Sequence, residues 1–221
     1  MTEIKSTPLK FYTLLPSFKA HVSEEKEQAL PKDIAQLLNN VKNSGSYQEY
    51  WDFIDKHIAN NPDFEKIDDE TFKKGEYYIK TSTNFDSDYD KTILNALKEK
   101  GISIAPEFID TASSKEGFSL NVLKIKGTKS GDLIDYTKGQ HLLSDKEKQE
   151  VYTQLQKLTK LGIVNVDILE GNSLKITPDK PHRVIAENWR NLCPVEEYTT
   201  DSPQKPRLII LEKIHSKLFK N

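Results

Sequence analysis

The chain has 221 residues, a formal net charge of −2, 36% hydrophobic and 30% charged residues. This balance excludes the global basic field that recruits nucleic acid or an acidic membrane surface. No apolar run approaches the roughly 18 residues of a membrane span. The single cysteine, Cys193, excludes an internal disulfide and suits a reducing compartment.

Two helices are predicted at the start, within an N-terminal extension of residues 1–62. Pro31 suits a first helical turn and Gly45 a helix end. Ser46 and Glu49 have the spacing of a capping box, and Asn61-Pro62 closes the second helix. Both helices carry an apolar stripe, so we expect them to face each other as a helical hairpin.

The middle of the chain is predicted as strand, helix, strand, strand. GEYYIK (75–80) forms a strand that ends at Lys80, and residues 90–100 form a helix that ends before Gly101. ISIAPEFID (102–110) and FSLNVLKI (118–125) form two further strands, separated by a polar turn.

Further on, Ser144 and Glu147 begin a helix with the apolar stripe Val151, Leu155, Leu158 and Leu161. The loop GIVNVDILEGNSLKI (162–176) follows. Residues 173–177 and 182–186 are predicted as a strand pair around a proline-containing turn, and residues 206–220 as a final helix.

Asp167 and Asn172 lie five residues apart between a helix and a hairpin. Phosphotransferases use this order, with the aspartate orienting the attacking hydroxyl and the asparagine holding magnesium. Asp and Asn also satisfy backbone groups in ordinary loops, so the spacing alone leaves both interpretations open.

The C-terminal half, from about Ser119, resembles the minimal bacterial effector kinases of the OspG/NleH type. VLKIKGTKSGDLID resembles the hinge, QLQKLTKLGIVNVDILEGNSL the catalytic loop with its helix, and VIAENWRN the metal-binding segment. Only 33 residues follow Asn188, which suits the truncated C-lobe of these effectors.

The resemblance implies an α+β fold, a reduced bilobal protein-kinase-like fold with an N-terminal helical hairpin. Residues 63–126 would form the small N-lobe, and residues 127–221 a truncated helical C-lobe with the catalytic-type loop. The hairpin, residues 31–61, is expected where the glycine-rich loop would otherwise lie.

Site residues are carried over from the resemblance one by one. Asp167 would be the catalytic base. Lys80 would hold the phosphates of ATP, with Asp90 in place of its helix carboxylate partner. Asn172 would bind Mg²⁺, together with a residue of the metal-binding segment, where Asn188 and Glu187 are the two candidates.

The chain departs from the family pattern at several positions. Asn165 replaces the histidine before the catalytic aspartate, and Asn188 replaces a metal-binding aspartate, although an amide carries no charge for magnesium. No glycine-rich loop precedes Lys80. The segment IDDE (67–70) instead places three carboxylates where phosphates would lie, and residues 63–82 look too short for three strands.

Three functions remain open. One is an effector kinase that transfers phosphate from ATP to a protein Ser or Thr. Another is a pseudokinase that binds a partner, which the resemblance suggests to be a ubiquitin-pathway or signalling protein. A small-molecule phosphotransferase is the third, because the pattern of residues 90–100 also suits that group.

Location and other partners follow from composition and resemblance together. The N-terminus lacks the apolar region of a cleaved secretory signal. We therefore expect a cytoplasmic protein, or one secreted into a host cell without a cleaved signal peptide. Neither nucleic acid nor a membrane span is expected.

Overall fold

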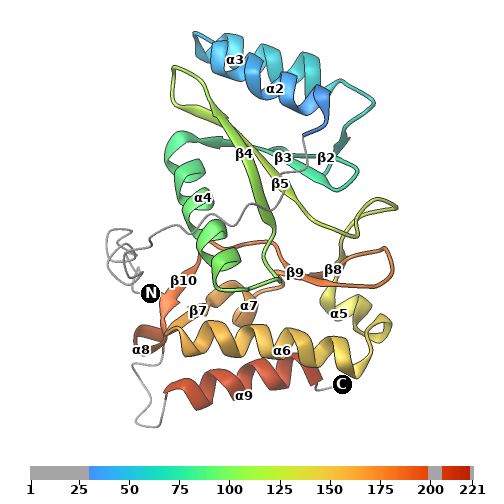
Figure 1. Ribbon diagram of the computed structural model, residues 1–221, viewed down its shortest axis with the longest axis vertical. Helices are drawn as coiled ribbons and strands as arrows, with labels where there is room; N and C mark the ends of the chain where they lie inside the picture. Colours follow the sequence, from blue (N-terminus) through green and yellow to red (C-terminus); the bar gives the residue numbers. More distant parts are fainter. Residues whose placement is uncertain (1–29, 199–205, 220–221) are drawn as a thin grey trace.

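The computed structural model describes residues 30–198 and 206–219, which form an α+β structure (Figure 1). The helical elements are α2 (Lys32–Asn43), α3 (Tyr47–Ile54), η2 (Asp55–Ala59), α4 (Asn84–Glu99), α5 (Tyr136–Gly139), η3 (Gln140–Leu142), α6 (Asp145–Lys160), α7 (Val166–Glu170), α8 (Val195–Tyr198) and α9 (Pro206–Phe219). The strands are β1 (Glu65–Lys66), β2 (Thr71–Lys74), β3 (Tyr77–Thr83), β4 (Glu107–Ser113), β5 (Phe118–Lys124), β6 (Ile134–Asp135), β7 (Ile163–Asn165), β8 (Leu174–Ile176), β9 (Val184–Ala186) and β10 (Leu192–Pro194).

An antiparallel five-stranded sheet has the order β1-β2-β3-β5-β4. Side chains alternate between its faces. Ile79 of β3 therefore joins Ile34 of α2 and Tyr50 of α3 in one apolar core, while its neighbour Lys80 points to the opposite face. Helices α2 and α3 consequently cover one side of the sheet.

A second apolar core joins α4 to the C-terminal part of the chain. It includes Ile93 and Leu97 of α4, Leu155 of α6 and Ile214 of α9. Figure 1 shows α6 and α9 side by side below the sheet, with α4 between them and α2–α3. Helix α4 is thus held by the sheet above and by the helical part below.

The predicted order of strand, helix, strand, strand is confirmed by β3, α4, β4 and β5, with different boundaries. Helix α4 begins at Asn84 and not at Asp90, because Thr83 caps it by accepting a hydrogen bond from the Asp86 amide. The apolar stripe starts only at Ile93, so periodicity missed the first turns. The strand expected from residue 102 begins at Glu107, directly after Pro106, which has no amide proton to donate to a neighbouring strand.

Three expectations about the start of the sheet are wrong. Residues 65–83 do hold three strands, because β1 has only two residues and tight turns join the strands. Lys80 therefore lies within β3 and not at its end. The connection between β1 and β2 is Ile67–Glu70, so the helices α2 and α3 do not occupy that position.

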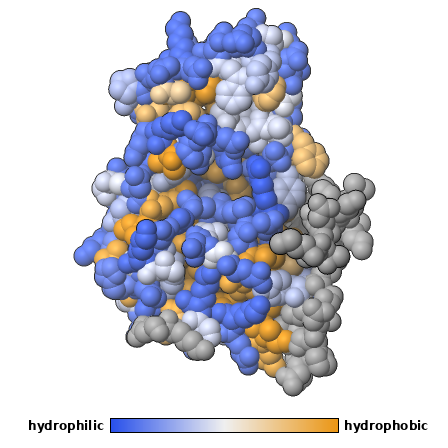
Figure 2. Space-filling view, turned by 180° about the vertical axis from the view of Figure 1, so that it is seen from behind, coloured by the Kyte–Doolittle hydropathy of each residue, from blue (hydrophilic) through white to orange (hydrophobic). Residues whose placement is uncertain are grey.

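The surface is largely polar. Hydrophilic residues dominate the face in Figure 2, where hydrophobic residues form only small groups. Among the residues that the structure describes, no helix combines the length and apolarity required to cross a bilayer.

Tyr50 supplies a test of the packing between α3 and the sheet. Its side chain is fully buried, and its hydroxyl donates a 2.9 Å hydrogen bond to the Ser119 carbonyl. Burial raises the pKa of Tyr50. Tyr50→Phe leaves that carbonyl without its donor, so we expect the free energy of unfolding, measured with urea, to fall by about 1–2 kcal/mol.

The matched control is Tyr47→Phe, since Tyr47 lies one turn earlier and is 55% exposed. Its urea midpoint should stay at the wild-type value. Equal losses in the two variants would contradict a specific role for the Tyr50 hydroxyl.

Candidate functional site

A cleft of about 360 Å³ lies between the sheet, α4 and the segment after β9. Its volume is within the range of about 300–1,000 Å³ that is typical of small-molecule sites. The cleft is lined by Ile67, Asp68, Thr71, Tyr78, Lys80, Asp90, Ile93, Leu94, Pro106, Leu123, Ile125, Glu187, Asn188, Trp189 and Arg190.

Four of the six predicted site residues meet in this cleft. Lys80 comes from β3, Asp90 from α4, and Glu187 and Asn188 from the segment that follows β9. The other two do not line it: Asp167 lies in α7, and Asn172 is an exposed residue before β8. The structure thus assembles the residues expected at the phosphates, and leaves the expected base and one expected metal ligand outside.

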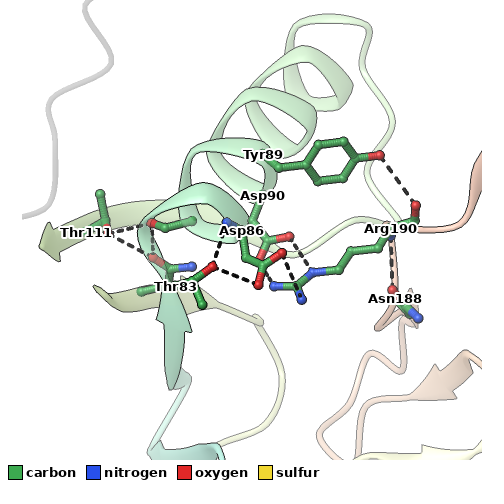
Figure 3. Close-up of polar contacts among 9 residues, drawn as sticks. Thr83, Asp86, Tyr89, Asp90, Thr111, Asn188 and Arg190 are labelled. Atoms are coloured by element: carbon green, nitrogen blue, oxygen red, sulfur yellow. Dashed lines mark hydrogen bonds and ion pairs between the residues drawn. The ribbon is translucent and has the colours of Figure 1, made fainter. Parts of the chain in front are cut away.

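Arg190 occupies the partner position at Asp90, as Figure 3 shows. Its Nε and Nη2 donate to the two carboxylate oxygens of Asp90 at 3.1 and 2.9 Å. Asp86, one turn earlier in α4, lies 3.7 Å from Nη1. Hydrogen bonding to Asp90 raises the pKa of Arg190 further. Both oxygens of Asp90 are therefore engaged by one planar guanidinium, the geometry that makes such pairs strong.

Lys80 lies on the same wall of the cleft without that partner. Its side chain is half-buried, and within the described ranges its amine makes no hydrogen bond or ion pair. Its cross-strand neighbour Asn121 is buried and accepts hydrogen bonds from Ser87 and Thr111. The amine thus faces the cleft as an available cation.

The two candidate metal ligands are already engaged by the protein. The Asn188 side-chain oxygen accepts a 3.0 Å hydrogen bond from the Arg190 amide. Glu187 lies 3.5 Å from the Lys175 amine, and burial raises the pKa of Glu187. Over the described part of the chain, no three His, Cys, Asp or Glu side chains converge in a metal-binding group. The residues present do not fit a magnesium site of the expected kind.

Asp167 was predicted in a loop but lies in the helical turn α7. One carboxylate oxygen accepts a 2.8 Å hydrogen bond from the Asn191 side chain. The other is buried and has no hydrogen-bond partner among the described residues. Asp167 is therefore held against the segment that forms the floor of the cleft, one residue beyond Arg190.

Asn165 explains why α7 forms. Its side-chain oxygen accepts from the Ile168 amide at 3.1 Å and so caps the turn. Its side-chain nitrogen donates a 2.7 Å hydrogen bond to the Asn188 carbonyl. Asn165 is 2% exposed. This residue, which departs from the family pattern, therefore joins the predicted catalytic loop to the cleft segment through buried hydrogen bonds.

The end of the turn is equally constrained. The Gly171 amide donates to the Asp167 carbonyl at 3.0 Å, and a Cβ atom at Gly171 would lie 2.8 Å from that oxygen. The Lys217 amine of α9 donates to the Gly171 carbonyl, and burial lowers the pKa of Lys217. Asn172 follows this closed turn and points to solvent.

Tyr78 is a cleft residue that the sequence interpretation missed. Its ring packs with Ile125 and Ile185 in a small apolar cluster between the sheet and β9, and burial raises the pKa of Tyr78 to about 12. The two-residue spacing from Lys80 places both side chains on one face of β3, and this signal was available in the sequence. Arg190 had no such signal, because its partner Asp90 lies 100 residues away.

No family model matches the chain, and no curated protein matches it. Among solved structures, it is similar to the one titled "Crystal structure of BubR1 kinase domain". The two are 12% identical, the match covers 86% of this chain and 75% of that one, and the TM-score is 0.41.

Arg190→Ala should destabilise the protein, because it leaves the 15% exposed Asp90 side chain without its partner. We expect the free energy of unfolding, measured with urea, to fall by about 1–3 kcal/mol. Asp90→Asn should cause a similar loss, and the double variant should lose less than the sum of the two.

Lys66→Ala is the control, since it breaks the solvent-exposed ion pair between Lys66 and Asp69. It should leave the urea midpoint unchanged. Fully additive losses for Arg190→Ala and Asp90→Asn would contradict a direct interaction between these two side chains.

Glu187→Gln should make the protein more stable at neutral pH. The pKa of Glu187 in the folded protein is raised above its ordinary value of 4.5, so ionisation favours the unfolded chain. The stability that this group contributes is present below pH 4.5 and is lost as the pH rises through the folded-state pKa. Thermal unfolding should therefore give a higher Tm for the variant at pH 7 and equal values at acidic pH.

The control for this pH series is Glu116→Gln, at an exposed carboxylate in the turn between β4 and β5. Its Tm difference from the wild type should not change with pH. A Glu187→Gln difference that is constant with pH would show that burial of the charge is not its cause.

Proposed function

We propose that the chain has a reduced protein-kinase-like fold and acts as a pseudokinase, a module that binds partner proteins without transferring phosphate. Support for the fold comes from the order of parts. Lys80 lies on a strand of the small sheet, Asp90 on the helix packed against it, and Glu187 with Asn188 after the β8–β9 hairpin. Kinases use the same order for the lysine, its helix carboxylate and the metal-binding segment.

The bidentate ion pair between Arg190 and Asp90 carries the proposal that catalysis is absent. In an active kinase the helix carboxylate holds the lysine that binds the phosphates. Here both Asp90 oxygens bind Arg190, and Lys80 is left without that support. A nucleotide would have to displace a charge-assisted pair before Lys80 could be positioned.

Charge in the cleft also opposes a nucleotide. Asp68 and Glu187 face it in addition to Asp90, while its cations are Lys80 and Arg190. Three carboxylates and two cations line the cleft, and Lys175, which is outside the lining, lies 3.5 Å from Glu187. The cleft therefore offers a triphosphate no net positive charge.

An enzyme that transfers phosphate from ATP to a protein Ser or Thr is the second candidate. The available Lys80 amine in a cleft of suitable volume favours it. In that case Asp167 would act as base after α7 rearranges. Both candidates are compatible with a cytoplasmic protein or with an effector that enters a host cell.

Thermal unfolding in the presence of millimolar ATP with Mg²⁺ or Mn²⁺ separates the two. We expect no rise in Tm for the wild type, since a ligand raises Tm only when its concentration approaches its Kd. Asp68→Asn combined with Glu187→Gln removes two cleft carboxylates and should produce a small nucleotide-dependent rise.

A wild-type rise in Tm that saturates with ATP, and that Lys80→Ala removes while Lys66→Ala does not, would overturn the pseudokinase proposal. Phosphate transfer from labelled ATP that is lost in Asp167→Ala would then support the enzyme.

A further inference from the structure

A second concave surface, the basic groove, lies where the starts of β3 and β4 and the end of β5 meet the loop between β8 and β9. It encloses about 1420 Å³ and shares no lining residue with the cleft. Seven lysines and arginines and four carboxylates line it. This local excess of positive charge contrasts with the net charge of −2 of the whole chain.

The four carboxylates are engaged inside the protein. Glu76 accepts a hydrogen bond from the Gly127 amide, and Glu107 pairs with Lys98. Asp110 accepts from the Thr111 amide, and Asp179 accepts from the Lys129 and Ser130 amides. These interactions hold the walls of the groove and partly neutralise its negative side chains.

Four cations of the groove remain available. The side chains of Lys126, Lys129, Lys180 and Arg183 are exposed, and none of their side-chain nitrogens makes a hydrogen bond or ion pair with the residues that the structure describes. The other three are engaged: Lys74 pairs with Asp33, Lys98 with Glu107, and Lys124 lies over the Tyr77 ring.

The available cations lie on two neighbouring loops that are hydrogen-bonded to each other. Lys126 and Lys129 belong to the connection after β5, and Lys180 and Arg183 to the loop between β8 and β9. The bonds from the Lys129 and Ser130 amides to Asp179 join these two loops. The half-buried ring of Tyr77 and the exposed Pro181 line the same groove.

We propose that the basic groove binds an extended acidic segment of a partner protein, one that alternates carboxylate and apolar side chains. Carboxylates would pair with the four available cations, and apolar side chains would cover Tyr77 and Pro181. Charge complementarity across such a surface gives specificity and fast association. A peptide fits this lining better than nucleic acid does, because the groove lies in a chain without an overall basic field. The inference rests on the proposed role in partner binding and supplies the chemistry of the partner.

The test is a fluorescence-anisotropy titration of the full chain with a labelled peptide of alternating glutamate and leucine. We expect saturable binding that weakens as salt is raised. The triple variant Lys126→Glu, Lys180→Glu, Arg183→Glu should bind the peptide with an affinity that is lower by about tenfold or more, because three attractive contacts become repulsive.

The matched control reverses the same number of charges at exposed helical lysines outside the groove: Lys56→Glu, Lys91→Glu, Lys146→Glu. It should bind like the wild type, and circular dichroism with thermal unfolding should show that both triple variants are folded. If the glutamate variant does not fold, Lys126→Gln, Lys180→Gln, Arg183→Gln replaces it, with the same direction of effect.

Three results would overturn the inference: no peptide binding to the wild type, equal weakening in the groove and control variants, or tighter groove-dependent binding of a single-stranded oligonucleotide than of the peptide. The nucleotide titration is independent. If the wild type binds ATP, and peptide binding is lost only in the groove variant, the pseudokinase proposal is refuted while the proposed role of the basic groove is supported.

Discussion

The ion pair between Arg190 and Asp90 determines how the cleft is built. It attaches α4 to the extended segment 187–191, and neighbouring residues of that segment bond to the loop below. The Asn188 carbonyl accepts a hydrogen bond from the Asn165 side chain, and the Asn191 side chain donates one to the Asp167 carboxylate. Because Ile93 and Leu97 of α4 are also packed in the lower core, one short segment couples the sheet, α4 and α7.

The charged surfaces of the molecule are separate, since the cleft and the basic groove share no lining residue. Three carboxylates line the cleft, where Arg190 is paired with Asp90. The available cations line the basic groove, on other elements of the fold. A ligand rich in negative charge therefore meets no net positive charge in the cleft and an excess of cations in the basic groove. The net charge of −2 conceals this separation, because it sums the charges of the whole chain.

Much of the fold followed from local signals in the sequence. Ser144 and Glu147 form a complete capping box in the structure. Val151, Leu155 and Leu158 of the predicted stripe are buried, whereas Leu161, which follows the last residue of α6, is 45% exposed. Helix α4 shows the limit: its first turns are polar, so only the cap at Thr83 marks their start. In the site, the family resemblance assigned Lys80, which does line the cleft. The pairing of Asp90 with Arg190 depends on a tertiary contact across 100 residues, so the sequence contains no pattern that predicts it.

Asp167 and Asn172 show why a motif spacing does not fix a site. An extended loop advances about 3.3 Å per residue, but a helical turn rises only about 1.5 Å. Asn165 caps such a turn and Gly171 permits its tight end against the Asp167 carbonyl. The segment between the two residues is therefore compact. The Asp167 side chain contacts Asn191, and Asn172 is exposed to solvent. The residues between the two motif positions, and not the motif residues themselves, decide whether they can act together.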